Sequence, residues 1–334
     1  MNTIQQWSIG AAIALSLGLS GCAKQQSTTT ATSDTKPTSS SSAKLTTLSI
    51  GFQKASLNSI VLKEQHLLEQ EFPNTKIEWK EFPAGPQMLE ALAVGAVDFG
   101  SVGNTPPIFA QAANKGIVYV GYENVHPKWQ AVLVSADSPL KTIADLKGKR
   151  IAVQKGSSAH DLLGRVLQKA HLTWSDIQPI WLAPADARAA LDKKSVDAWV
   201  IWEPFLSAAE LEGHARPLID GSAFETTYNF VIGNPDFVQA HPQETARFLN
   251  ALNHAAQWIV DHPKESLQFY QQAIGLNADI AQRVLDKRYK PSLTQSITPT
   301  VAQAQQQIAD RFYQEKVIPK QIHIQDAILN NTVK

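Results

Sequence analysis

From residue 45 onward, apolar residues follow strand-like and helix-like spacings in turn. Residues 76–80 alternate polar and apolar side chains, as a half-buried strand does, whereas residues 243–260 repeat apolar side chains at helical spacing. The pattern predicts strands at 48–52, 76–80, 98–102, 118–122, 131–134, 150–153, 179–182, 196–202 and 228–232. It predicts helices at 59–71, 87–94, 106–114, 158–170, 186–192 and 243–260, within a tail that is almost wholly helical. This alternation indicates an α/β fold, here as two α/β units in succession.

The N-terminal residues break this pattern. Residues 9–19 form an apolar run of eleven residues, whereas a membrane-spanning helix needs roughly 20, so the run is typical of a signal peptide. Residues 19–22 (Leu-Ser-Gly-Cys) resemble the lipobox of bacterial lipoproteins, in which the cysteine is acylated and becomes the new N-terminus. We therefore expect residues 1–22 to be a lipoprotein signal peptide and Cys22 to be the site of lipid attachment. The alternative is an ordinary secreted protein with a free thiol.

The next segment has the composition of a tether. Between Ser27 and Ser42, 12 of 16 residues are Ser or Thr, and none is a large apolar residue. Such a segment cannot bury enough surface to offset its chain entropy. We expect residues 23–44 to be a disordered tether, and the folded part to sit outside the cytoplasmic membrane, held by lipid alone.

Composition and charge exclude several classes of function. Lys plus Arg and Asp plus Glu both total 30, so the chain lacks the electrostatic footprint of a nucleic-acid-binding protein. The single cysteine excludes a disulfide framework and a cysteine-based zinc cluster. The nine histidines contain no His-Glu-x-x-His pattern, and no Gly-x-Ser-x-Gly elbow is present. We expect no metal, no cofactor and no enzymatic activity.

Seven segments, in order over about 155 residues, resemble the substrate-binding proteins of aliphatic-sulfonate ABC importers. They are GFQKAS (51–56), EFPAGPQMLE (81–90), VGNTPP (102–107), DLKGK (145–149), QKGSSAH (154–160), PADAR (184–188) and VDAWVIWEP (196–204). The resemblance implies a type II periplasmic-binding-protein fold, with two α/β lobes, two hinge crossovers and a ligand cleft. It implies that residues 45–133 and 228–334 form lobe one, and that residues 134–227 form lobe two.

The resemblance also implies a function and partners. The expected ligand is a small organosulfonate, which the protein would deliver to the permease and ATPase subunits of an importer for sulfur assimilation. We expect a monomer anchored by lipid on the periplasmic or cell-surface face of the cytoplasmic membrane, with no nucleic-acid partner. Relatives of the same fold that bind taurine, nitrate or a thiamine-precursor pyrimidine leave those ligands open.

Two positions depart from the family pattern. The family usually has Asp where this chain has Asn104, and often Asp where it has Glu203. A carboxylate at the first position could pair with the ammonium of taurine. Since Asn104 has none, we expect taurine to bind less well than an alkanesulfonate of similar size.

Two loops have the features of an anion site. A buried sulfonate needs several aligned donors, and a helix N-terminus supplies both backbone N–H groups and a partial positive charge. The segments 103–107 and 156–160 each combine a glycine with residues that open a predicted helix. Without a ligand, each would be a plain helix start. The candidate ligand contacts from these loops are Asn104, Thr105, Gly156, Ser157, Ser158, Ala159 and His160.

Three further polar residues lie near predicted strand ends or crossovers. Gln53 ends the first strand, where ligands of open α/β sheets bind. Gln87 opens the helix after a Gly-Pro turn, and Asn229 lies near the return crossover. We expect all three amides to reach the cleft.

The strand at 196–202 carries two tryptophans. Trp199 and Trp202 lie three residues apart, so they point to opposite faces of the strand. Trp202 is nearer the carboxyl end, and we expect it to pack against the organic part of the ligand, whereas Trp199 belongs to the core. Arg188 is an arginine of a cleft-facing loop, although an exposed salt bridge explains it equally well.

Overall fold

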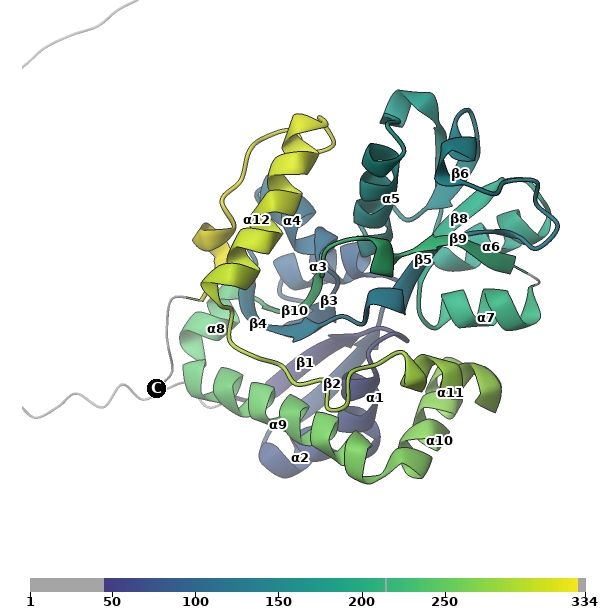
Figure 1. Ribbon diagram of the computed structural model, residues 1–334. Coiled ribbons are helices and arrows are strands. Elements are labelled where there is room, and N and C mark those ends of the chain that lie inside the picture. The colour runs from purple at the N-terminus through teal and green to yellow at the C-terminus, as the bar shows by residue number, and fades with distance from the viewer. Residues whose placement is uncertain (1–44, 214, 330–334) are drawn as a thin grey trace, which may run out of the picture. The chain divides into compact units, whose positions relative to one another are not determined.

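Two five-stranded sheets organise the chain, for which we analysed a computed structural model that describes residues 45–213 and 215–329 (Figure 1). The predicted signal peptide, Cys22 and the whole of the predicted tether lie outside the described residues. The first sheet has the order β2-β1-β3-β10-β4 and the second β7-β6-β8-β5-β9. The first sheet consists of β1 (Thr47–Phe52), β2 (Lys76–Glu81), β3 (Phe99–Val102), β4 (Val118–Asn124) and β10 (Tyr228–Gly233). The second consists of β5 (Gln130–Ser135), β6 (Arg150–Val153), β7 (Gln178–Trp181), β8 (Ala198–Trp202) and β9 (Ala215–Asp220).

Helices connect the strands and form the C-terminal part of the described chain. Those before the first crossover are α1 (Leu57–Glu64), α2 (Leu67–Glu71), α3 (Gly85–Ala93) and α4 (Thr105–Ala112). Those among the strands of the second sheet are α5 (Ser158–Lys169), α6 (Pro184–Asp192) and α7 (Phe205–Glu212). The remaining helices are α8 (Pro235–Ala240), α9 (Pro242–Asp261), α10 (Pro263–Ile274), α11 (Ala278–Asp286) and α12 (Pro299–Gln314). None of the helices in the described ranges has the length and apolarity to cross a membrane.

Both sheets are mixed, and the mixing shows where the chain changes sheet. In the first, β1 pairs in parallel with β2 and β3, whereas β10 runs antiparallel to β3 and β4. In the second, β6 pairs in parallel with β7 and β8, whereas β5 runs antiparallel to β8 and β9. The chain therefore crosses between β4 and β5 and returns between β9 and β10. The predicted boundary after residue 133 falls inside β5, so the first crossover lies a few residues earlier than expected.

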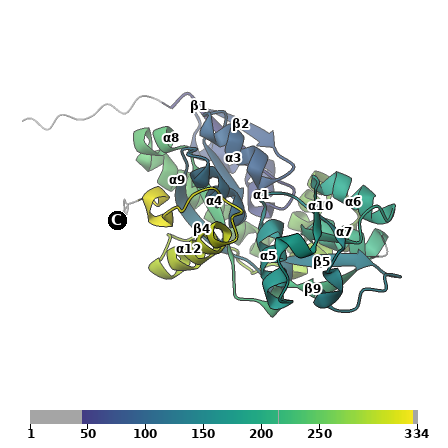
Figure 2. The ribbon, with the colours of Figure 1, turned by 90° about the horizontal axis from the view of Figure 1, so that it is seen from above.

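The core follows the expected burial pattern of such sheets. All five residues of β8 are buried, and Trp199 is 1% exposed, as its predicted core position requires. Helices on both faces of a sheet leave little of its strands in contact with water, which explains the nearly continuous apolar run of β8. Figure 2 shows α5, α6 and α7 around the second sheet.

Two elements, α7 and β9, were not among those predicted from the pattern. The β9 sequence contains Pro217, which argues against a central strand, but β9 is an edge strand and tolerates proline. The predicted helix at 59–71 is interrupted, because His66 adopts a left-handed conformation with φ of 52° between α1 and α2.

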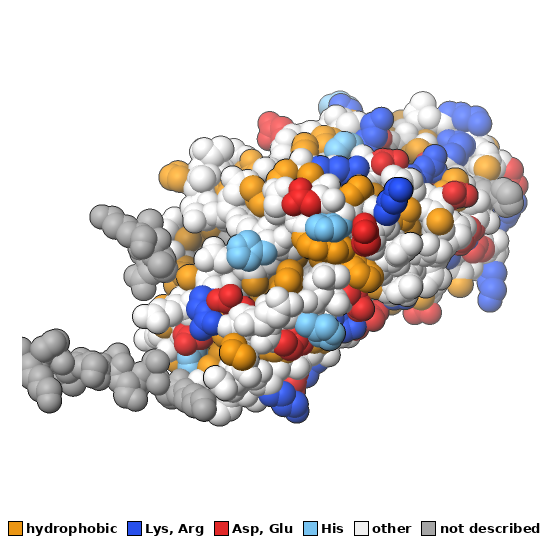
Figure 3. All heavy atoms as spheres, turned by 90° about the horizontal axis from the view of Figure 1, so that it is seen from below, with side chains coloured by type: hydrophobic (Ala, Val, Ile, Leu, Met, Phe, Trp, Pro, Cys, Tyr) orange, Lys and Arg blue, Asp and Glu red, His pale blue; other side chains and the backbone are white. Residues whose placement is uncertain are grey.

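On the face seen in Figure 3, acidic and basic side chains are interspersed, so this face carries no continuous basic patch for nucleic acid.

Candidate functional site

A cavity of about 50 Å³ lies among residues that both sheets contribute. The first sheet supplies the ends of β1, β3 and β4. The starts of α1 and α4, which follow β1 and β3, also lie in the wall. The second sheet supplies the start of α5 and the end of β8. The lining residues are Gln53, Ala55, Ser56, Leu57, Asn58, Ser59, Gly85, Ser101, Val102, Gly103, Pro106, Glu123, Trp129, Ser157, Ser158, Trp202, Asn229 and Arg288.

Among the helices that begin in the wall of this cavity, α1 and α5 each follow a serine. The helix α1 begins at Leu57 after Ser56, and α5 begins at Ser158 after Ser157. Neither preceding serine makes a capping hydrogen bond through its side chain, and the Ser157 hydroxyl donates to the Gln154 carbonyl at 2.7 Å. The first-turn N–H groups of a helix have no partner within the helix. Both helix starts therefore present backbone donors and partial positive charge to an anion in the cavity.

Arg288, in the segment after α11, adds a full positive charge to the same wall. Its Nη2 donates to Oδ1 of Asn58 at 3.0 Å, and its guanidinium carbon lies 5.8 Å from the centre of the Trp129 ring. Burial lowers the pKa of Arg288, while the nearby Glu123 acts in the opposite direction. An arginine side chain remains protonated in proteins, so this group provides a buried cation with several donors.

Glu123, at the end of β4, places a carboxylate in the cavity wall. Its Oε1 accepts hydrogen bonds from Nδ2 of Asn58 at 3.2 Å and from the hydroxyl of Thr294 at 3.1 Å. Burial raises the pKa of Glu123, and the charge of Arg288 opposes that shift. Asn58 thus bridges the two charged groups, because its amide donates to Glu123 and its carbonyl oxygen accepts from Arg288.

Five of the residues predicted from sequence lie in the cavity wall. They are Gln53, Ser157, Ser158, Trp202 and Asn229. Gln53 already donates through Nε2 to the Ser101 carbonyl at 2.9 Å, so one of its two N–H donors is engaged. Trp202 packs edge-on against Phe205, with ring centres 6.3 Å apart. Their roles as ligand contacts stay predictions.

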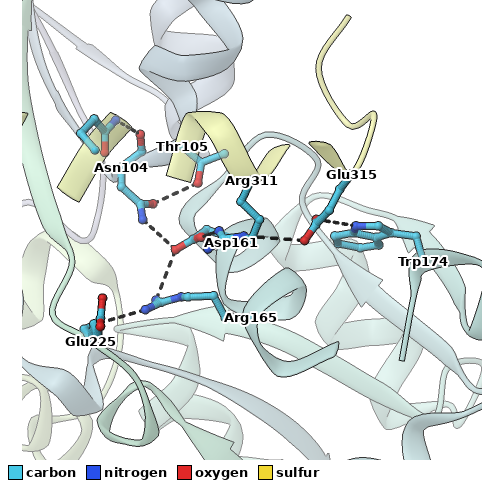
Figure 4. Close-up of polar contacts among 9 residues, drawn as sticks. Asn104, Thr105, Asp161, Arg165, Trp174, Glu225, Arg311 and Glu315 are labelled. Carbon is cyan, nitrogen blue, oxygen red and sulfur yellow. Dashed lines mark hydrogen bonds and ion pairs between the residues drawn. The ribbon is translucent and has the colours of Figure 1, made fainter. Parts of the chain in front are cut away.

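The other six predicted residues do not line this cavity. They are Gln87, Asn104, Thr105, Gly156, Ala159 and His160. Asn104 is 1% exposed, and its Nδ2 donates to Oδ2 of Asp161 on α5 at 2.8 Å. Its Oδ1 accepts a hydrogen bond from the Thr105 hydroxyl at 3.0 Å (Figure 4). The polar side chains at the start of α4 are therefore used in contacts with each other and with α5.

Asp161 is the centre of a polar cluster that joins α5 to α4 and α12 (Figure 4). It is fully buried, and it forms ion pairs with Arg165 of α5 at 3.2 Å and with Arg311 of α12. At the C-terminal end of α12, Oε2 of Glu315 accepts a hydrogen bond from Nε1 of Trp174 at 2.9 Å. We call these residues, together with Asn104, the Asp161 cluster; they connect the C-terminal helix α12 to the second-sheet part of the chain.

His160 lies beside this cluster in an aromatic environment. Its ring packs against those of Phe109, Trp174, Trp181 and Phe312, with ring centres 4.9–5.6 Å apart. Its Nδ1 accepts the backbone N–H of Gly156 at 3.2 Å. Burial lowers the pKa of His160 to about 3, so the ring stays neutral at physiological pH. His160 supports the loop before α5 from behind.

The lowered pKa of His160 predicts acid sensitivity. Between about pH 6.5 and pH 3, the unfolded chain binds a proton at this residue and the folded chain does not, so acidification lowers the free energy of unfolding. The slope from this residue is at most about 1.4 kcal/mol per pH unit. Urea unfolding from pH 7 to pH 4 should therefore show a smaller loss of stability in His160→Gln than in the wild type. Equal losses in the two proteins would contradict the prediction.

Comparison with known proteins shows the family of the chain. The model of the NMT1/THI5 like family matches residues 76–266. An aliphatic sulfonates-binding protein of Escherichia coli K12 is 44% identical over 285 residues, which cover 85% of this chain and 89% of that protein. The chain belongs to the NMT1/THI5 like family. A sulfonates-binding protein of Bacillus subtilis is 34% identical over 288 residues, covering 85% of this chain and 86% of that protein.

Solved structures of family members show the same architecture. The alkanesulfonate-binding protein SsuA of Xanthomonas axonopodis pv. citri, bound to MOPS, superposes with a TM-score of 0.83 at 44% identity, covering 86% of this chain and 99% of that one. The periplasmic aliphatic sulphonate binding protein SsuA of Escherichia coli gives 0.79 at 44% identity, covering 86% and 92%. The predicted periplasmic-binding-protein fold is confirmed, and this family member is a binding protein rather than an enzyme.

The sequence pattern did not reveal several residues of the cavity wall. Glu123, Arg288 and the start of α1 line the cavity, whereas Arg188 forms an ion pair with Asp192 of its own helix at 2.8 Å. Arg288 lies in the helical tail, far in sequence from the motif-bearing loops, so no local pattern could have identified it. Within residues 45–213 and 215–329, no three His, Cys, Asp or Glu side chains are grouped as a metal site would require.

Proposed function

We propose that this chain is the extracytoplasmic solute-binding component of an ABC importer, and that it captures aliphatic or aryl sulfonates for sulfur assimilation. The observation that carries the proposal is the cavity in which the starts of α1 and α5 converge with Arg288. A sulfonate is a permanent anion with three acceptor oxygens. The two helix starts supply backbone donors from opposite parts of the chain, and the guanidinium supplies charge.

The size of the cavity fits the head group of such a ligand. A cavity needs a volume of about 10–15 Å³ to hold one water molecule. A cavity of about 50 Å³ therefore accommodates a compact group the size of a few waters. Trp129 and Trp202 form an apolar part of the wall. Burial of alkyl surface against these rings contributes about 25 cal/mol per Å². A longer tail therefore adds affinity as far as the two parts of the chain can accommodate it.

Calorimetric titration tests the proposal. We expect ethanesulfonate, butanesulfonate and benzenesulfonate to bind with one site per chain, and affinity to rise with alkyl length. Sulfate should bind less tightly, because its second negative charge is left partly unpaired in the cavity. Nitrate should also bind less tightly, since it has no tail to bury against the tryptophans. Tighter binding of sulfate or nitrate than of alkanesulfonates would overturn the proposal.

The sequence also supports a proposal about location. We infer that Cys22 is acylated and that the protein is held by lipid on the periplasmic or cell-surface face of the cytoplasmic membrane. The Leu-Ser-Gly-Cys segment and the Ser/Thr-rich stretch after it support this inference. From there a monomer would deliver its ligand to the permease and ATPase subunits of its importer.

Replacement of the acylated cysteine gives a direct test of the anchor. Cys22→Ala should release the protein from the membrane fraction or stop processing of the precursor, because the lipid can no longer be attached. Fractionation and immunoblotting of cells that carry each form measure both effects. Unchanged processing and membrane association in the variant would contradict a lipid anchor.

A further inference from the structure

The sulfonate cavity contains a carboxylate, which is unexpected in a site for an anion. Among the described lining residues, the charged side chains are Glu123 and Arg288. Glu123 is held in place, because Asn58 and Thr294 both donate to its Oε1. A second negative charge close to a buried anion is unfavourable unless something compensates it. The carboxylate therefore requires an explanation in terms of the ligand.

The charge balance of the cavity points to that explanation. With Glu123 and Arg288 both ionised, their charges sum to zero. A sulfonate with a neutral tail brings the total to −1, whereas a sulfonate that also carries a cationic nitrogen leaves it at zero. Asn58 bridges the two side chains, so the wall presents a positive and a negative group next to each other. That arrangement complements a zwitterion.

A neighbouring cavity gives the tail a direction. It measures about 20 Å³ and shares Glu123, Trp129, Asn229 and Arg288 with the sulfonate cavity, but it lacks the residues at the start of α5. Glu123 and Arg288 thus both border the space that leads away from the α5 donors. Lys287, which also lines this second cavity, is neutralised by Glu203 at 2.6 Å. A tail that leaves the helix starts in this direction passes the Glu123 carboxylate.

We propose that Glu123 is a specificity-determining residue that accepts the cationic nitrogen of zwitterionic sulfonates, so that the preferred class is the aminoalkanesulfonates. The inference rests on the proposed function, since it requires the sulfonate to bind at α1, α5 and Arg288. It reverses the expectation drawn from Asn104, whose side chain contacts Asp161 instead of the cavity. The carboxylate for an ammonium group is supplied by β4 rather than by the loop before α4.

Matched ligands test this assignment by titration calorimetry on the intact protein. The pairs are 2-aminoethanesulfonate with 2-hydroxyethanesulfonate, and 3-aminopropanesulfonate with 3-hydroxypropanesulfonate. In the wild type, we expect the amino member of at least one pair to bind at least fivefold more tightly. In Glu123→Gln, which keeps the side-chain shape, the ratio should fall to near one. In the control Asp197→Asn, the carboxylate that is removed pairs with Arg150 at the start of β6, away from both cavities, and the ratio should persist.

The outcomes separate the inference from the proposed function. A ratio near one for both pairs in the wild type overturns the role of Glu123 and needs no variant. An unchanged ratio in a folded Glu123→Gln protein overturns it as well. If no sulfonate binds to the wild type, the proposed function itself is wrong. Circular dichroism establishes that each variant is folded before it is titrated.

Discussion

Arg288→Gln is expected to raise the Kd of every sulfonate by at least about 100-fold, or about 2.8 kcal/mol. The guanidinium is buried in the cavity wall beside Trp129, and it is the positive side chain among the described lining residues. Glutamine retains a hydrogen-bond donor but removes the charge. The sulfonate would then be held by helix starts alone, next to the Glu123 carboxylate.

A neighbouring arginine provides the control for this experiment. Arg283 lies on α11, where it pairs with Glu210 at 3.5 Å and is partly exposed. Arg283→Gln should leave the Kd within about twofold of the wild type, since an exposed ion pair contributes little. Titration calorimetry of both variants with the same alkanesulfonate measures the difference. Equal, small effects of the two substitutions would exclude Arg288 as the anion partner.

Asp161→Asn is expected to raise the Kd by roughly ten- to 100-fold, although Asp161 does not line the cavity. Asp161 is fully buried between Arg165 and Arg311, so its neutralisation removes its ion pairs with both arginines and leaves Arg311 with the more distant Glu315, at 3.8 Å. The arrangement in which α5 contacts α12 is then destabilised relative to an opened one. Because only the closed arrangement brings both helix starts to the ligand, the apparent affinity falls with its population.

Small-angle scattering distinguishes this effect from local damage to the site. The radius of gyration of the wild type should decrease when a sulfonate saturates it, as two lobes close. The same decrease should occur in Asp161→Asn, but only at a higher ligand concentration. Asp192→Asn, which removes a carboxylate paired on the surface of α6, serves as the control. An unaltered Kd in Asp161→Asn would show that the Asp161 cluster does not bias closure.

Local pattern was sufficient for most of the fold. The alternation at 76–80 and the helical spacing at 243–260 correspond to β2 and α9, because each depends only on which face of an element meets water. The same argument assigned Trp199 to the core and placed Trp202 at the cavity. In contrast, the pattern at 131–134 identified a strand without showing which sheet it joins. Sheet membership depends on pairing partners that lie far away in sequence.

The site was predictable only where a helix start carried it. Ser157 and Ser158 follow a glycine and open α5, so sequence alone indicated a donor-rich loop. The second loop has the same features, yet Asn104 binds Asp161, because the packing of α5 against α4 determines which groups it meets. Glu123 and Arg288 are 165 positions apart in the sequence, and Asn58 bridges them in the fold. No local spacing encodes such an encounter.

The helix α5 carries both the backbone donors of the cavity and the carboxylate of the Asp161 cluster. Its first residue lines the cavity, and Asp161 follows three positions later, within the same turn. A helix of 12 residues is about 18 Å long and moves as a unit, so its donors and its carboxylate cannot be displaced independently. Any force that separates α5 from α12, for example at the ion pair between Asp161 and Arg311, therefore also withdraws the donors from the anion. Release of the ligand can thus begin at the contact between α5 and α12, without any group entering the cavity.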